Sequence, residues 1–221
     1  MVLLIAGSGA SYQILAERRE AKRFPAPGRL VDIGGRRLHV MCSGRGTPGV
    51  LIEASGLGTA LQSAAVQREL ATTQRVCSYD RAGLGWSDSS PYPATAKAME
   101  QDLEQLLDKI DLRAPLILVA SSAGGLSAEQ IRRAPPIQST IPAIVLVHGQ
   151  PRDIDPSASA ATLAELEPKW RAAQAQFSGR FTRSKLVVVE NSGHLIVTER
   201  PDAVVKAVRD VQRLAADSSS N

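Results

Sequence analysis

A serine at the end of an apolar segment is the residue of this sequence that is best placed for nucleophilic chemistry. Residues 115–120 read PLILVA, a run typical of a buried strand, and residues 121–125 continue as SSAGG. A serine between a strand and a helix is the setting of a nucleophile elbow, whose tight turn tolerates only small neighbours two positions away. Ser122 has alanine and glycine there and is our predicted nucleophile, whereas Ser121 has alanine at the trailing position and fits less well. The alternative is a strand-to-helix turn of small residues that has no catalytic role.

A histidine and an acid follow this serine along the chain. His194 lies in a loop just after the last apolar strand, where it can act as a general base. His148 ends a strand nearer the serine and is the competing base, whereas His39 lies far from it in the first hairpin. Asp153 and Asp155 follow the strand that ends near residue 147, and an acid there would orient the histidine. We predict Asp153 as this acid, and the alternative is an exposed loop carboxylate.

A serine nucleophile also needs two backbone N–H groups that stabilise negative charge on the substrate oxygen. One would belong to Ala123, which follows the nucleophile at a helix N-terminus. The other is expected from Gly56 or Leu57, because glycines in the loop after the strand at 50–54 allow close backbone approach. We expect neither a cofactor nor a metal ion at this site.

Alternating strands and helices are expected to bring these segments together. Apolar runs predict strands at 50–54, 75–79, 115–120, 141–147 and 185–189, and helical patterns cover 61–71, 95–110, 163–177 and 201–214. Residues 30–33 and 36–42 around two glycines predict a β-hairpin. Apolar strands alternating with amphipathic helices indicate an α/β fold, a mostly parallel sheet with helices on both faces and antiparallel strands from the hairpin.

The composition excludes several classes of function. A chain of 221 residues with 43% hydrophobic residues suits one globular domain. A net charge of +4 without a long basic run argues against nucleic-acid binding. Two cysteines and three histidines are too few for a disulfide-rich scaffold, a four-cysteine zinc site or a histidine-rich metal centre.

The first 26 residues are expected to form a segment apart from the folded domain. Residues 1–16 are apolar but shorter than the roughly 20 residues of a transmembrane helix. We interpret them as an amphipathic helix or a membrane anchor, with a cleaved signal as a further alternative. Prolines at 25 and 27 end any helix, so we assign 27–216 to the folded domain and 217–221 to a disordered tail.

These motifs together resemble the α/β-hydrolase superfamily over residues 27–214. The matching segments are EASGLG at 53–58, CSYDRAGLGWSD at 77–88, the elbow around Ser122, SGH at 192–194 and ERP at 199–201. The Asp-Arg-x-Gly-x-Gly-x-Ser stretch that begins at Asp80 is the most specific of them. The chain also resembles the bacterial branch in which a short N-terminal apolar anchor precedes a Pro-Gly-Arg-Leu opening.

The resemblance implies a serine hydrolase that cleaves an ester, thioester or amide bond of a small molecule through an acyl-enzyme. The order Ser122, Asp153, His194 is the order of the superfamily's triad. A serine at the elbow argues against relatives with an aspartate nucleophile, namely epoxide hydrolases and haloalkane dehalogenases. The resemblance also places the strands of Cys42 and Cys77 side by side, so we predict neighbouring cysteines, with a disulfide in an oxidising compartment.

The chain departs from this superfamily after the elbow. Only fifteen residues separate Gly125 from Ile141, and the segment 126–133 is short and polar. We therefore expect a truncated fold that lacks the helical cap and one helix–strand unit. The acid is then Asp153, Asp155 or absent, and the apolar sheet surface left uncovered would favour self-association.

Two other classes of protein remain as alternatives. The first is a non-catalytic, degenerate hydrolase-like protein, because of the missing segment. The second is a dinucleotide-binding domain, since Gly56-x-Gly58 follows a strand and Asp80 ends the next strand. The third glycine of that motif is replaced by Leu61, so its signal is weak.

Overall fold

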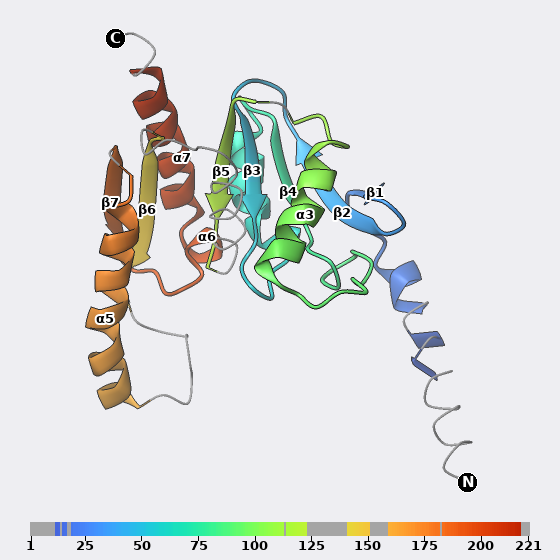
Figure 1. The fold of residues 1–221 in the computed structure, drawn as a ribbon, viewed down its shortest axis with the longest axis horizontal. Helices are drawn as coiled ribbons and strands as arrows, with labels where there is room; N and C mark the ends of the chain where they lie inside the picture. The colour runs from blue at the N-terminus through green and yellow to red at the C-terminus, as the bar shows by residue number, and fades with distance from the viewer. Residues whose placement is uncertain are drawn as a thin grey trace.

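The computed structural model describes residues 12–13, 15–16, 19–112, 114–122, 141–150, 159–181 and 183–217. The strands are β1 (Arg29–Asp32), β2 (Arg37–Ser43), β3 (Gly49–Glu53), β4 (Val76–Tyr79), β5 (Leu116–Ala120), β6 (Ala143–His148) and β7 (Ser184–Val189). The helices are the 3-10 helix η1 (Ala60–Ser63), α2 (Ala64–Leu70), α3 (Ala96–Leu107), α5 (Ala160–Ser178), α6 (Ile196–Glu199) and α7 (Pro201–Ala216). Figure 1 shows their arrangement.

The predicted fold class is confirmed. Strands β1 to β5 form one sheet in the order β1-β2-β4-β3-β5, in which β3 pairs in parallel with β4 and β5. The predicted hairpin supplies the antiparallel pairs β1–β2 and β2–β4. Two details differ from the sequence-based expectation: the helix expected at 61–71 is divided into η1 and α2, and the four-residue α6 was not expected.

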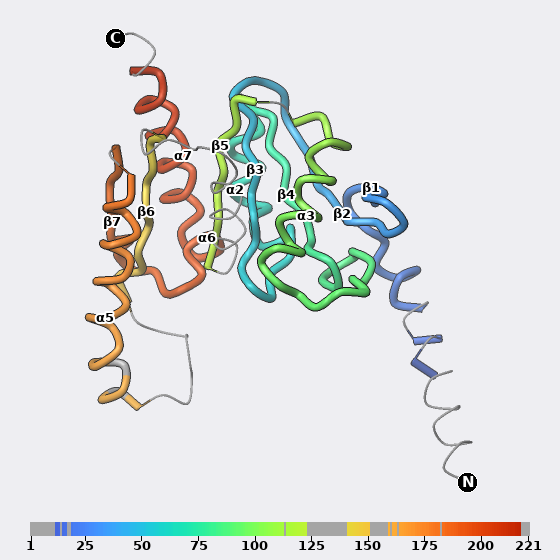
Figure 2. Tube along the Cα trace, in the orientation of Figure 1, coloured from blue at the N-terminus to red at the C-terminus, as the bar shows by residue number. Residues whose placement is uncertain are grey.

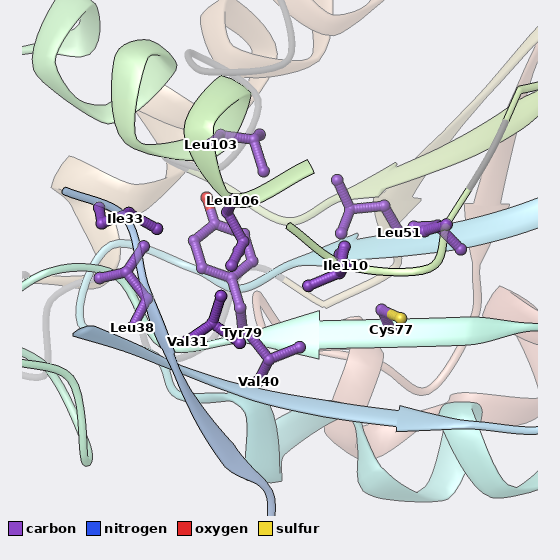
Figure 3. Close-up of a cluster of buried hydrophobic side chains, with 11 residues drawn as sticks. Val31, Ile33, Leu38, Val40, Leu51, Cys77, Tyr79, Leu103, Leu106 and Ile110 are labelled. Carbon is purple, nitrogen blue, oxygen red and sulfur yellow. The ribbon is translucent and has the colours of Figure 1, made fainter. Parts of the chain in front are cut away.

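Apolar side chains cover both faces of the five-stranded sheet, as its alternating residues require. On one face, Leu51 and Tyr79 pack with Leu103 and Leu106 of α3 (Figure 3). The opposite face is covered by α2, α6 and α7. Its cluster contains Val50, Ile52, Val66, Leu70, Val76, Ile117, Val197, Val204, Val205 and Val208. The sheet is therefore a buried central layer with helices on both sides.

Strands β6 and β7 pair in parallel in a second, two-stranded sheet. Helix α7 contacts β5, β6 and α2, and α6 contacts η1, so the two C-terminal helices connect this sheet to the larger one (Figures 1 and 2). No hydrogen-bonded strand joins β5 to β6 within the part of the chain that the structure describes. The predicted loss of a helix–strand unit concerns residues 123–140, which lie outside the described residues, and it stays a prediction.

Several apolar side chains of the sheet edges are exposed. They are Leu116 and Leu118 of β5 and Leu186, Val187 and Val188 of β7. Self-association through these edges stays a prediction, as does membrane association through residues 1–16, most of which lie outside the described residues. Within the described ranges, each helix is too short or too polar to cross a membrane.

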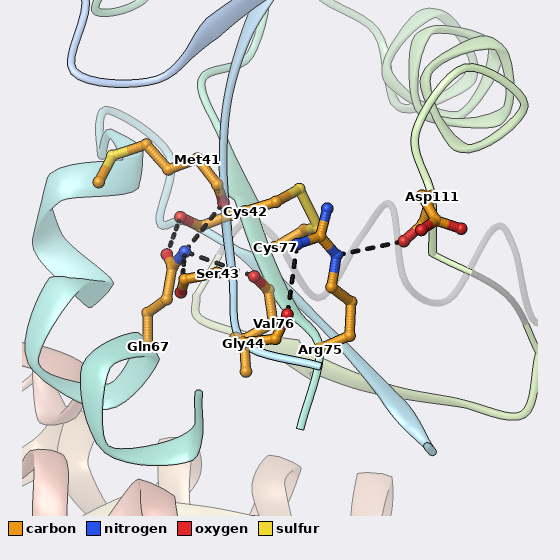
Figure 4. Close-up of a disulfide and its surroundings, with 10 residues drawn as sticks. Met41, Cys42, Ser43, Gly44, Gln67, Arg75, Val76, Cys77 and Asp111 are labelled. Carbon is orange, nitrogen blue, oxygen red and sulfur yellow. Dashed lines mark hydrogen bonds between the residues drawn. A yellow bond between two sulfur atoms is a disulfide. The ribbon is translucent and has the colours of Figure 1, made fainter. Parts of the chain in front are cut away.

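The two cysteines are bonded to each other, which confirms the predicted proximity. Cys42 of β2 lies directly opposite Cys77 of β4, with Cα atoms 4.1 Å apart and a disulfide between the side chains (Figure 4). The buried Gln67 side chain of α2 donates nearby to the carbonyl of Met41 and the hydroxyl of Ser43. The disulfide and this amide therefore both tie the hairpin to the elements around β4.

The most specific motif of the sequence begins at a buried carboxylate. Asp80 accepts from His39 Nδ1 at 2.8 Å, from the Ala60 amide at 2.7 Å and from the Trp86 amide at 3.1 Å. The other nitrogen of His39 accepts from the amide of Gly28. Asp80 thus joins the end of β4 to β2, to the start of η1 and to its own loop.

The glycines of this loop give a matched pair for a stability measurement. Gly85 has φ +52°, and a Cβ there would lie 2.1 Å from Asp80 Oδ2, whereas Gly83 has φ +78° and no atom within 4 Å of its added Cβ. Gly85→Ala should destabilise the fold by roughly 3 kcal/mol, through strain and the displaced carboxylate, and Gly83→Ala by about 1 kcal/mol through strain alone. Urea unfolding measures both, and equal losses would contradict this account.

Candidate active site

Ser122 follows β5 at the edge where the parallel strands end. The amide of Ser121 donates to the carbonyl of Glu53 at 3.2 Å, so the last bond to β3 lies immediately before Ser122. Ser122 has φ +52°, a left-handed conformation that a residue with a side chain adopts only under strain. Such strain is characteristic of functional sites, and it is the backbone geometry expected of an elbow serine.

His194 lies against this serine. Its Nε2 is 3.0 Å from Ser122 Oγ, within the range required of a nucleophile and its general base. The two residues are 72 positions apart in the chain, and the pair is open to solvent. The structure therefore brings the predicted nucleophile and the predicted base within hydrogen-bond distance of each other, beyond the end of β5.

Main-chain and carboxylate contacts fix the loop that carries His194. The amide of Gly193 donates to Glu199 Oε2 of α6 at 2.8 Å, and the amide of Gln150 donates to the carbonyl of Ser192 at 3.0 Å. Ser192 is fully buried. The main chain just before His194 is thus bonded to α6 on one side and to the residue that follows Gly149 on the other.

The competing base, His148, is committed to a different contact. It is 1% exposed, its Nε2 lies 3.0 Å from Glu167 Oε2, and its ring stacks on Trp170 at 4.2 Å. Burial alone would raise the pKa of Glu167, but hydrogen bonds from His148 and Arg171 outweigh it and lower that pKa. His148 therefore joins β6 to α5 and is not exposed to a substrate.

The remaining predicted site residues are placed only in part. Asp153, Asp155 and Ala123 lie outside the described residues. Within the described ranges, no carboxylate is hydrogen-bonded to His194. The nearby carboxylate of Glu199 binds the Gly193 amide instead. The acid of a triad is therefore still a prediction, with the same two candidates.

Gly56 and Leu57 occupy the centre of a tight turn at the end of β3. The amide of Gly58 donates to the carbonyl of Ser55 at 3.0 Å and closes this turn, and Leu57 is 90% exposed. Glu53 pairs with Ala120 across β3 and β5, so the turn and Ser122 follow neighbouring strands at one edge. Within the described part of the chain, the amides of Gly56 and Leu57 have no hydrogen-bond acceptor. Both therefore remain candidates for the second predicted oxyanion donor.

A buried ionic group beneath this turn was not singled out from the sequence. Arg81 Nη1 lies 3.1 Å from Glu53 Oε1, and the Tyr79 hydroxyl donates to Glu53 Oε2 at 2.6 Å. Burial and the charge of Glu53 raise the pKa of Tyr79, so its hydroxyl stays protonated. The signal available in the sequence was the motif match at Glu53 and Arg81, which carried no role for either side chain.

The dinucleotide-binding alternative is incompatible with these contacts. The carboxylate that would bind a ribose belongs to Asp80, which is 0% exposed and accepts three hydrogen bonds from the protein. A hollow lined by Arg45, Thr47, Arg75 and Leu112 lies at the opposite edge of the sheet, away from Ser122. The candidate site residues that the structure describes lie instead where β3, β5 and β7 end.

The fold and the site define a class of protein, an α/β protein with a serine–histidine pair at the carboxyl ends of a parallel sheet. A model of the alpha/beta hydrolase family matches residues 40–181, and the chain belongs to this family. Its solved neighbours include a predicted CIB-like hydrolase from Thermoplasma acidophilum and a thermophilic esterase from Thermogutta terrifontis. The first is 16% identical in sequence with a TM-score of 0.63, and the match covers 84% of this chain and 96% of the hydrolase chain. The second is 17% identical in sequence with a TM-score of 0.62, and the match covers 84% of this chain and 98% of the esterase chain.

Two curated relatives match the chain over a shorter length. A probable transporter efuK from Hormonema carpetanum is 41% identical over 103 residues, which are 44% of this chain and 15% of that protein. An AB hydrolase superfamily protein from Gibberella zeae is 37% identical over 97 residues, which are 42% of this chain and 30% of that protein. The chain thus spans less than a third of the length of either relative.

Proposed function

We propose that this chain is a serine hydrolase that cleaves an ester, thioester or amide bond of a small molecule through an acyl-enzyme. The observation that carries the proposal is the 3.0 Å separation between Ser122 Oγ and His194 Nε2, with Ser122 in a strained conformation at a strand end. The similarity in fold to an esterase supports a carbonyl substrate, and we favour an ester.

The chemistry follows from these groups. Ser122 Oγ attacks the substrate carbonyl while His194 Nε2 takes the hydroxyl proton. The amides of Ala123 and of Gly56 or Leu57 stabilise the oxyanion. The tetrahedral intermediate collapses, His194 gives its proton to the leaving group, and the acyl group stays on Ser122. Water, deprotonated by His194, then attacks the acyl-enzyme. The bond between the acyl group and Ser122 Oγ breaks, His194 returns the proton to that oxygen, and the acid leaves.

Covalent labelling tests this proposal directly. A fluorophosphonate probe should modify the intact protein at Ser122, located by mass spectrometry of the labelled peptide. The same preparation should hydrolyse p-nitrophenyl butyrate, and labelling should abolish that turnover in proportion to its extent. A folded protein that is neither labelled nor active would instead support the second candidate, a non-catalytic α/β-hydrolase-like protein. The specific observation behind that candidate is that no described carboxylate binds His194.

The acid is tested by two conservative substitutions. Asp153→Asn should lower kcat by roughly 10³- to 10⁴-fold, because a triad acid orients the histidine and stabilises its charged form. Its melting temperature should stay close to that of the parent. Asp155→Asn is the matched control two residues away and should keep most of the activity. The reverse pattern would assign the acid to Asp155, and two fully active variants would show that neither is the acid.

A further inference from the structure

We propose that Arg81 is a positioning residue of this site, which holds the Ser55–Gly58 turn so that the amides of Gly56 and Leu57 keep a fixed direction. The inference rests on the proposed function, because it assigns those amides to the oxyanion. The contact itself can be measured without any turnover.

The guanidinium group of Arg81 contacts the main chain that leads into the turn. Nη1 donates to the carbonyl of Ala54 at 3.1 Å, and Nη2 donates to the carbonyl of Ser55. Arg81 is only 7% exposed, so these charge-assisted hydrogen bonds are shielded from water. Two consecutive carbonyl groups are therefore fixed by one side chain.

Fixing a carbonyl also fixes the next amide. The peptide unit is planar and trans, so its N–H points opposite to its C=O. The carbonyl of Ser55 is directed at the buried Arg81, and the N–H of Gly56 must therefore point away from Arg81. The Gly58 amide donates to the same carbonyl from within the turn, so the Ser55–Gly56 peptide has two constraints. A glycine can adopt more backbone conformations than other residues, and the bond from Arg81 is the constraint that ties this peptide to the buried interior.

Glu53 fixes the guanidinium in turn and links it to the nucleophile. Its side chain is 1% exposed and accepts from Arg81 and from Tyr79. Its carbonyl accepts from the amide of Ser121, the residue before the proposed nucleophile. The turn and the proposed nucleophile are thus positioned from the same residue of β3, which keeps the candidate donors of Gly56 and Leu57 in register with Ser122.

A lysine cannot reproduce this arrangement. The planar guanidinium presents several N–H groups in fixed directions, whereas an ammonium group is a single point at the end of a flexible chain. Arg81→Lys therefore keeps the buried positive charge beside Glu53 but cannot donate to the carbonyls of Ala54 and Ser55 at the same time. This makes it the substitution that separates positioning from charge.

The chain offers a matched control at the other end of the same strand. Arg75 precedes β4 and donates to the carbonyls of Asp111 and Gly44 (Figure 4). With p-nitrophenyl butyrate, Arg81→Lys should lower kcat about 10- to 100-fold with little change in KM, because an oxyanion donor acts in the transition state. A trifluoromethyl ketone inhibitor should weaken by a similar factor. Arg75→Lys should leave kcat, KM and the inhibition constant unchanged.

A second measurement is independent of catalysis. In protein labelled with ¹⁵N at glycine and leucine, the amides of Gly56 and Leu57 should have order parameters near those of rigid backbone, about 0.85. In Arg81→Lys they should fall below about 0.6, and in Arg75→Lys they should not change. If Arg81→Lys does not fold, Glu53→Gln should give the same loss of order in smaller measure, because it removes the charge that orients the guanidinium.

The two measurements separate the possible failures. An inactive parent in which Gly56 and Leu57 lose order only in Arg81→Lys would refute the proposed function and leave the positioning role standing. An active parent for which Arg81→Lys keeps both its kcat and its rigid turn would overturn the positioning role alone. Equal losses of kcat in Arg81→Lys and Arg75→Lys would reduce both arginines to general stabilisers of the fold and would also overturn it.

Discussion

Ser122→Ala should lower the turnover of p-nitrophenyl butyrate by roughly 10⁴- to 10⁶-fold, the range found when a catalytic serine is removed. Without Oγ no acyl-enzyme can form, and His194 has no hydroxyl to deprotonate. The comparison requires kcat from purified proteins with matched circular dichroism. The substitution should not destabilise the fold, because the Ser122 side chain is exposed and its hydroxyl makes no buried contact.

Ser121→Ala is the control for this experiment. Ser121 is joined to β3 through its amide, which the substitution keeps, so the variant should retain a readily measurable rate. Active Ser122→Ala together with inactive Ser121→Ala would place the nucleophile one residue earlier. Loss of activity in neither variant would show that the observed hydrolysis does not use this elbow.

His194→Ala should lower kcat by a comparable factor, roughly 10⁴-fold or more, since nucleophile and base act as one unit. The residual rate should then rise with hydroxide concentration, because hydroxide replaces the missing base. A pH–rate profile of the parent and the variant measures this difference. The double variant with Ser122→Ala should be little worse than either single variant.

His148→Phe provides the matched control for the histidine. Among the contacts of the described residues, a phenyl ring can keep the stacking on Trp170 and loses the bond to Glu167. It should therefore reduce stability while the kcat of the folded protein stays near that of the parent. A His148→Phe variant that loses turnover beside an active His194→Ala would assign the base to His148.

The sequence predicts the strands of this fold well because each is a short apolar run between turn residues. All seven begin and end within two residues of the predicted bounds, and β5 leads directly to Ser122 as expected. Short elements were harder to predict: a four-residue helix such as α6 is too brief to show a helical period. The serine and the histidine stand out as candidates in the sequence because both follow predicted strands.

Contacts between distant residues account for what the sequence did not show. Arg81 reaches main-chain carbonyls 26 and 27 positions earlier, and His39 meets Asp80 across 41 positions. No spacing along the chain encodes such pairs, because they depend on the order of strands in the sheet. His148 likewise ends a strand, as a catalytic base could, but its ring stacks on Trp170, which lies 22 positions further along the chain. The acid is different: Asp153 lies outside the described residues, so its role is decided by mutation.

The proposed serine–histidine pair spans two separately hydrogen-bonded sheets. Ser122 follows β5 of the larger sheet, whereas His194 follows β7 of the smaller one, and α6 and α7 provide the packing between them. Proteins open locally along such boundaries at less free energy than complete unfolding requires. A partial opening between the two sheets would separate the Ser122 hydroxyl from the His194 imidazole, while the hydrogen bonds between the strands within each sheet stayed intact. The rate of hydrolysis would then measure whether the two sheets are packed together, and not whether each sheet is folded.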